Sequence, residues 1–122
     1  HSDTLLGSIF LESLKTQCDL WPRGEVAEDF HNPVVSDLPV LLLSGERDPV
    51  TPPHYADQAA SSYSNHLNLV AQGQSHSVMK HPCFKKVTTD FIAAGLTDDV
   101  DTTCVEDIEA SPFFTSLLGP NP

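Results

Sequence analysis

The stretch LPVLLLSGERDPVTPPHYADQAA, residues 38–60, decides the fold of this chain. Its first part, residues 38–44, is a continuous apolar run that is too short for a typical helix. Such a run predicts a strand covered on both faces, as in a parallel sheet. An acidic loop carrying Asp48 follows, and then a helix is predicted over 53–64, with Thr51 as its N-cap.

The same order repeats further along the chain. HLNLVAQG (66–73) predicts a second strand, and the apolar face of CFKKVTTDFIAAG (83–95) predicts a helix that stops at Gly95 in a left-handed conformation. Two parallel strands joined by a helix form a right-handed crossover, so both strands end at the same edge of the sheet. The sequence therefore predicts an α/β fold built from a parallel strand-helix-strand-helix unit.

The flanking segments are less regular. Apolar residues at helical spacing predict an N-terminal helix over 3–18, and a connector rich in turn-forming residues follows it. Residues 96–109 are rich in carboxylates and are expected to be a solvated loop. The predicted organisation is a helix and irregular connector over 1–37, a core unit over 38–95 and an acidic C-terminal tail over 96–122.

Charge and composition exclude several classes of partner. The chain has 17 acidic and 6 basic residues and a net charge of -11, which repels nucleic acids and anionic membranes. No apolar run reaches the roughly 18 residues of a membrane span, and no signal peptide is evident.

The cysteines lack zinc spacing, and His76, His81 and Cys83 have no evident fourth ligand. We expect no metal and no cofactor.

Two polar side chains follow the two predicted strands. Asp48 comes after the first strand and His76 after the second. Ligands and catalytic groups of open α/β folds gather at the carboxyl edge of the sheet, so we expect these side chains to meet there. The Asp48 carboxylate is expected to accept the Nδ1 proton of His76, which leaves Nε2 to take a proton from a nucleophile.

Several segments carry a resemblance to a known family. LPVLLLSGERDPVTPPHYADQAA followed by LVAQGQSHSVMKHPC resembles the C-terminal part of the α/β-hydrolase fold, and more narrowly the secreted tripeptidyl-aminopeptidase-like (TAP-like) group and its proline-iminopeptidase relatives. In that group the aspartate of a Ser-Asp-His triad lies in G-x-x-D-P-V-T-P and the histidine in G-x-G-H-G. Here Ser75 and Ser77 flank His76 instead. CDLWP and TTCVEDIEASPFF extend the resemblance over residues 18–114.

The resemblance implies a serine peptidase that acts near peptide N-termini, with small esters as the less favoured substrates. It assigns Asp48 and His76 to the catalytic triad. Glu46 is the candidate for binding the substrate α-amino group, and the alternative is that Glu46 is an exposed loop carboxylate. A second class of function is a non-catalytic α/β binding or structural module, in which Asp48 caps a helix and His76 bonds a backbone carbonyl.

The sequence lacks the motif that carries the nucleophilic serine in this family. The chain begins at His1, contains no G-x-S-x-G elbow, and predicts fewer strands than this fold normally has. We therefore expect a C-terminal fragment of a larger hydrolase, inactive alone, whose partner is the remaining N-terminal part. Its exposed strand edge favours a homodimer when it is isolated.

The cysteines bear on location. In an exported protein, Cys83 and Cys104 can close a loop of about 20 residues that contributes on the order of 3 kcal/mol by chain entropy, which leaves Cys18 without a partner in this chain. The alternative is three reduced thiols in the cytosol. Because the resemblance is to a secreted group, we expect a secreted or periplasmic protein.

Overall fold

The computed structural model describes residues 5, 7–114 and 116–119. They fall into two units, His1–Asn32 and Pro33–Pro122, each described by itself. The first unit contains one helix, α1 (Ile9–Leu20), none of whose residues is buried. This helix was predicted over 3–18, of which residues 3, 4 and 6 lie outside the described part. It begins later because Gly7 has a left-handed backbone (φ 51°), which a right-handed helix excludes.

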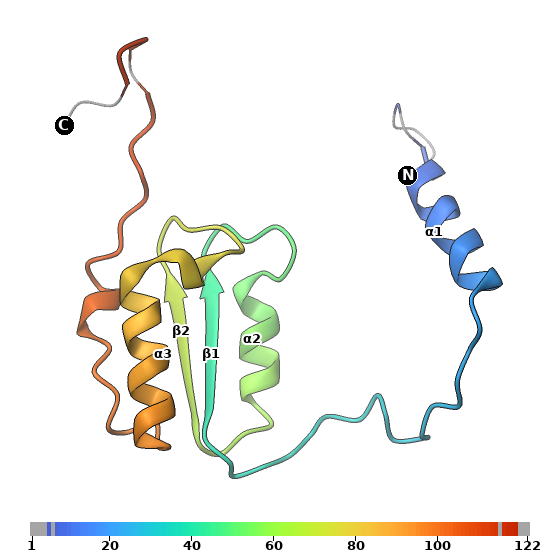
Figure 1. Cartoon of the computed structure of the whole chain (residues 1–122), viewed down its shortest axis with the longest axis horizontal. Helices are drawn as coiled ribbons and strands as arrows, with labels where there is room; N and C mark the ends of the chain where they lie inside the picture. The colour runs from blue at the N-terminus through green and yellow to red at the C-terminus, as the bar shows by residue number, and fades with distance from the viewer. Residues whose placement is uncertain (1–4, 6, 115, 120–122) are drawn as a thin grey trace. The chain divides into compact units, whose positions relative to one another are not determined.

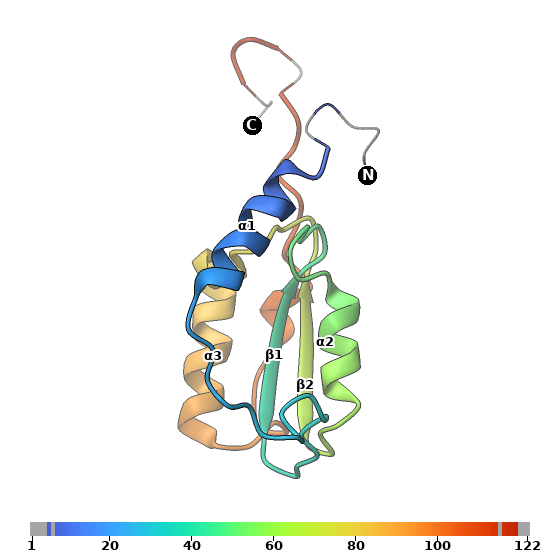
Figure 2. The ribbon, with the colours of Figure 1, turned by 90° about the vertical axis from the view of Figure 1, so that its right-hand side faces the viewer.

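The second unit is a small three-layer α/β structure. Strands β1 (Val40–Gly45) and β2 (His66–Ala71) pair in parallel, from Val40 opposite His66 to Gly45 opposite Ala71. Helix α2 (Pro53–Ala60) joins them, and helix α3 (Pro82–Ala94) follows β2. Figures 1 and 2 show α2 and α3 on opposite sides of the sheet. The predicted α/β class and the strand-helix-strand-helix order are confirmed.

The ends of α2 differ from the prediction. The N-cap is Pro52 rather than Thr51, and no side chain caps the helix. The helix also stops at Ala60, four residues early. The reason for the early stop is that Tyr63 forms a parallel bridge with Ser36, which draws the following residues into an extended path toward β2. Gly95 does end α3 in the left-handed region, as predicted (φ 66°).

The core of this unit lies between the sheet and α3. Its buried residues are Ala71, Val78, Cys83, Phe84, Val87 and Ile108. Val78 belongs to a short 3-10 helix, η1 (Val78–Lys80), and a second one, η2 (Thr103–Val105), lies in the C-terminal segment. Ile108 comes from the segment expected to be a solvated loop, and Val100 and Val105 pack against the same cluster.

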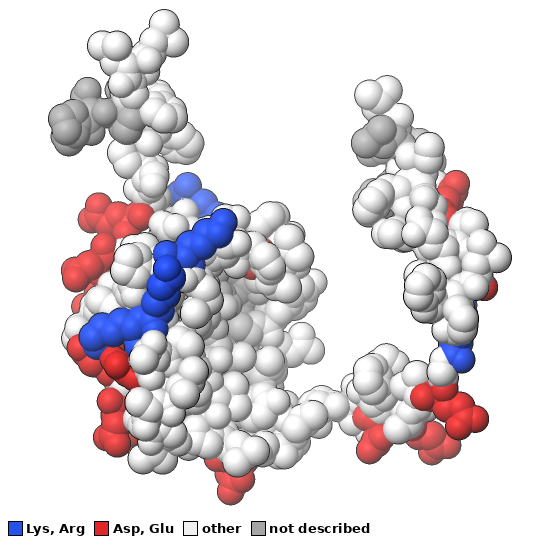
Figure 3. Space-filling model, in the orientation of Figure 1, with Lys and Arg blue, Asp and Glu red and all other residues white. Residues whose placement is uncertain are grey.

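That expectation for 96–109 holds for its carboxylates but not for several of its apolar side chains. Val100, Val105 and Ile108 of this segment pack on the core, whereas Leu96 and all of the acidic side chains are exposed (acidic residues red in Figure 3). Isolated apolar residues among carboxylates show no periodicity, so the sequence pattern does not predict that they are buried. Within the described residues, every helix is too short or too polar to cross a membrane.

Candidate active site

The loop after β1 holds Asp48 in a tight turn. Its Oδ1 accepts hydrogen bonds from the backbone N–H groups of Val50 (2.8 Å) and Thr51 (3.1 Å). Its Oδ2 accepts a third from the Thr51 hydroxyl at 2.8 Å. The side chain is only 3% exposed. An aspartate whose side chain accepts bonds from the backbone two and three residues ahead is typical of such turns. These local bonds fix the position of the carboxylate independently of any contact from another loop.

The loop after β2 brings His76 to this carboxylate. Its Nδ1 lies 2.8 Å from Asp48 Oδ2 and 3.3 Å from Thr51 Oγ1. The ring is 55% exposed. The structure thus brings together the two residues that the sequence predicted as a pair, at the carboxyl edge of the parallel sheet. Thr51 joins them, a role that the sequence reasoning missed. A hydroxyl three residues after a turn aspartate is the signal that points to it.

Two backbone contacts explain why the loops meet. The Arg47 N–H donates to the Gln74 carbonyl at 2.9 Å. At Gly45, any side chain would overlap the backbone carbonyl of Ser75. Glycine at the last position of β1 therefore lets the loop of His76 cross directly over the strand end.

Glu46, the predicted substrate contact, also links these loops. Its Oε2 accepts the Gly73 N–H at 2.7 Å and lies 3.8 Å from Arg47 Nε. The side chain is 45% exposed, so the carboxylate remains accessible at the rim of the site. Its role toward a substrate stays a prediction.

The electrostatics favour one tautomer of His76. Burial alone would raise the pKa of Asp48, but hydrogen bonds from His76, Thr51 and Val50 outweigh it and hold that pKa well below its usual range. The ionised carboxylate only accepts hydrogen bonds, so Nδ1 of His76 carries the proton. The lone pair then lies on Nε2, which forms no hydrogen bond within the described ranges.

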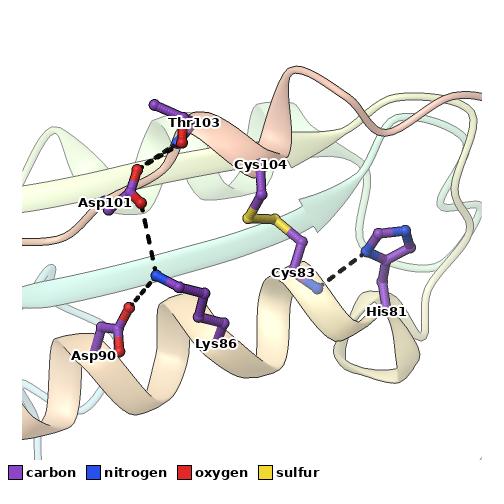
Figure 4. The surroundings of a disulfide bond; sticks show 7 residues. All are labelled: His81, Cys83, Lys86, Asp90, Asp101, Thr103 and Cys104. Carbon is purple, nitrogen blue, oxygen red and sulfur yellow. Dashed lines mark hydrogen bonds and ion pairs between the residues drawn. A yellow bond between two sulfur atoms is a disulfide. The ribbon is translucent and has the colours of Figure 1, made fainter.

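The segment that follows His76 is anchored by a disulfide between Cys83 and Cys104 (Figure 4). Cys83 lies in the first turn of α3, and its N–H donates to His81 Nδ1 at 3.3 Å. His81 therefore caps the helix. Cys18 is a free, exposed thiol in the first unit. No group of three or more potential metal ligands converges in the part of the chain described.

A family model described as TAP-like protein, from the α/β-hydrolases, matches residues 3–104. The chain belongs to the TAP-like family. The match includes both strands, both helices of the second unit, Asp48, His76 and the disulfide. No curated protein and no solved structure matches it significantly. The resemblance seen in the sequence is therefore confirmed, and the TAP-like chain is an α/β-hydrolase domain.

Proposed function

We propose that this TAP-like chain supplies the aspartate and the histidine of a Ser-Asp-His triad in a serine peptidase that cleaves peptides near their N-terminus. The observation that supports this most is the 2.8 Å contact between Asp48 Oδ2 and His76 Nδ1 at the carboxyl edge of the sheet. Small esters are the less favoured substrates.

In this mechanism the two residues have distinct roles. Nε2 of His76 takes the proton from a serine hydroxyl as the oxygen attacks the substrate carbonyl. Asp48, buried and ionised, stabilises the imidazolium that forms and keeps the ring oriented. His76 then returns the proton to the leaving amine, and the acyl-enzyme is hydrolysed by water activated in the same way.

The nucleophile is proposed to come from outside these 122 residues. The sequence has no G-x-S-x-G elbow, and no described serine hydrogen-bonds His76. The remaining N-terminal part of the hydrolase would supply the serine and the oxyanion donors, so we expect the chain alone to be inactive. Glu46 would bind the substrate α-amino group, because Gly73 occupies one of its oxygens and leaves the other for an ammonium.

The partner surface follows from the sheet. Among the described residues β1 pairs only with β2, so its other edge presents unpaired backbone groups. We propose that the N-terminal part of the hydrolase adds a strand there, and that the isolated chain forms a homodimer through the same edge. Light scattering at several concentrations tests the dimer.

The disulfide supports a secreted or periplasmic location.

The experiment that tests the proposal compares the hydrolase containing this chain with the chain alone. Both are treated with a fluorophosphonate, which labels activated serines, and assayed with an N-terminally free peptide anilide. We expect labelling of a serine outside residues 1–122 and loss of both signals in His76→Ala. The matched control is His66→Ala, an exposed histidine at the opposite end of β2.

Two results would overturn the proposal. In the first, the chain alone hydrolyses the substrate and His76→Ala abolishes this activity. The nucleophile would then lie within residues 1–122. Full activity in His76→Ala would favour the second candidate, a non-catalytic module. In that alternative Asp48 was expected to cap a helix and His76 to bond a backbone carbonyl, but Asp48 accepts from Val50 and Thr51 ahead of α2, no side chain caps α2, and His76 Nδ1 bonds Asp48 instead.

A further inference from the structure

We propose that the cavity beside His76 binds a carboxylate of the substrate, so that the hydrolase acts on short peptides with a carboxylate close to the scissile bond. This rests on the proposed function, because it names the substrate class of the same site. The inference comes from what lines the cavity and from the charges that are left unpaired there.

The cavity has a volume of about 490 Å³ and opens beside the proposed general base. His76 lines this cavity together with the apolar residues Leu43 and Met79, and two lysines, Lys80 and Lys85, complete the lining. An apolar lining with a few polar groups is typical of small-molecule sites of this size. The wall therefore combines the base, a surface for aliphatic groups and a double positive charge.

The two lysines are unusual in so acidic a chain. With 17 acidic residues against 6 basic ones, a carboxylate partner is expected for most cations. Lys86, the next residue along α3, has two: Asp90 at 2.7 Å and Asp101 at 3.7 Å (Figure 4). By contrast, no carboxylate of the described residues lies within ion-pair distance of Lys80 or Lys85.

The charge is also concentrated in space. Figure 3 shows the basic side chains (blue) of the second unit gathered on the face over η1 and α3, with acidic ones (red) bordering them at the left edge of the view. An anion approaching the otherwise negative protein is therefore attracted to the surface beside His76. A cationic or neutral ligand gains nothing there.

The size of the cavity limits how far the carboxylate lies from the reacting carbonyl. A volume of 490 Å³ corresponds to a width of about 10 Å, which is roughly three residues of extended chain. Because Lys80, Lys85 and His76 line the same cavity, we expect a carboxylate bound by the lysines to lie about three residues from a carbonyl at His76. Both the C-terminal carboxylate of a short peptide and the side chain of Asp or Glu meet this condition.

Binding by the isolated chain tests the inference without requiring catalysis. The ¹⁵N-labelled chain is titrated with acetyl-Ala-Ala, with its C-terminal amide, and with acetyl-Glu-Ala amide, which carries only a side-chain carboxylate. Amide shifts at residues 76–80 and 85 report occupancy. Loss of each exposed ion pair is expected to weaken binding about 2–5-fold, so acetyl-Ala-Ala should bind about 4–25-fold more tightly than its amide.

The variants identify the groups responsible. Lys80→Gln with Lys85→Gln should remove the preference for carboxylate over amide, while Lys86→Gln, the matched control, should leave it intact. The preference should also shrink at high salt. If acetyl-Glu-Ala amide binds as well as acetyl-Ala-Ala, the pocket also binds side-chain carboxylates. If it binds only as well as the neutral amide, the pocket recognises the C-terminal carboxylate alone.

Equal binding of the carboxylate and the amide would refute the inference, as would a loss in Lys86→Gln as large as in the double variant. Its failure is distinguishable from failure of the proposed function. Hydrolysis that requires His76 but cleaves carboxylate and amide substrates equally well would sink this inference alone. If the chain binds carboxylates but His76→Ala keeps full hydrolytic activity, the proposed triad is refuted and the carboxylate site is not.

Discussion

Replacing Asp48 with asparagine probes the candidate triad with the smallest change of shape. The carboxylate accepts four hydrogen bonds, from the N–H groups of Val50 and Thr51, from the Thr51 hydroxyl and from His76 Nδ1. The amide oxygen of asparagine can keep both backbone bonds at Oδ1. The amide NH₂ then replaces Oδ2, facing the histidine ring.

That replacement forces His76 to change its tautomer. A donor facing Nδ1 is stabilised only if Nδ1 becomes an acceptor, so the ring proton moves to Nε2. A protonated Nε2 cannot take the proton of a serine hydroxyl. In serine proteases the same change lowers kcat by about 10⁴-fold, and we expect a loss of that order in the hydrolase that contains this chain.

The assay is kcat for an N-terminally free peptide anilide, with circular dichroism to check that the variant is folded. Thr51→Val is the control, because it removes the hydroxyl bond to Oδ2 and the 3.3 Å contact with His76 Nδ1 but leaves the carboxylate that fixes the tautomer. It should cost about tenfold at most. A loss below tenfold in Asp48→Asn, or an equal loss in the two variants, would show that Asp48 does not set the tautomer of a catalytic His76.

Three further predictions concern the stability of the fold. The pKa of Asp48 is lower in the folded chain than in the unfolded one, so its contribution to stability is complete above about pH 4 and declines as the pH falls further. Thermal unfolding between pH 7 and 2 should therefore show a drop below pH 4 that is smaller in Asp48→Asn, where Asp101, whose pKa is lowered by Thr103 and Lys86, still contributes. Cys104→Ser opens a loop with a sequence separation of 21 residues and should lower the free energy of unfolding in urea by about 3 kcal/mol, whereas Cys18→Ser should leave it unchanged. Gly45→Ala drives a methyl group into the Ser75 carbonyl and should cost about 1–3 kcal/mol in the same measurement; an unchanged midpoint would show that the two loops are not in contact.

The parts predictable from the sequence are those governed by local patterns. The apolar run at 38–44 predicted a strand, which is seen at Val40–Gly45, because a continuous apolar run is typical of a strand between two layers of helices; its first four residues are half-buried and its last two are buried. The approach of Asp48 to His76 could be expected from the parallel order of the two strands, whose ends share one edge, together with the resemblance to the TAP-like group; the strand order by itself is a weak signal.

Features that depend on tertiary packing were missed. Ile108 is buried although carboxylates flank it, because the disulfide and α3 hold its segment on the core. Thr51 was assigned to a helix cap, but its hydroxyl bonds the nearby aspartate, a choice that depends on how the turn closes. The cavity with Lys80 and Lys85 arises where η1 and α3 meet, which no single pattern encodes.

The most direct test of the central claim is the tautomer of His76, read from long-range ¹H–¹⁵N correlations of the imidazole rings in the labelled chain at neutral pH. We expect a proton on Nδ1, shifted far downfield by its hydrogen bond to Asp48, which disappears in Asp48→Asn. A proton on Nε2 in the wild-type chain, or an Nδ1 proton unaffected by Asp48→Asn, would contradict it.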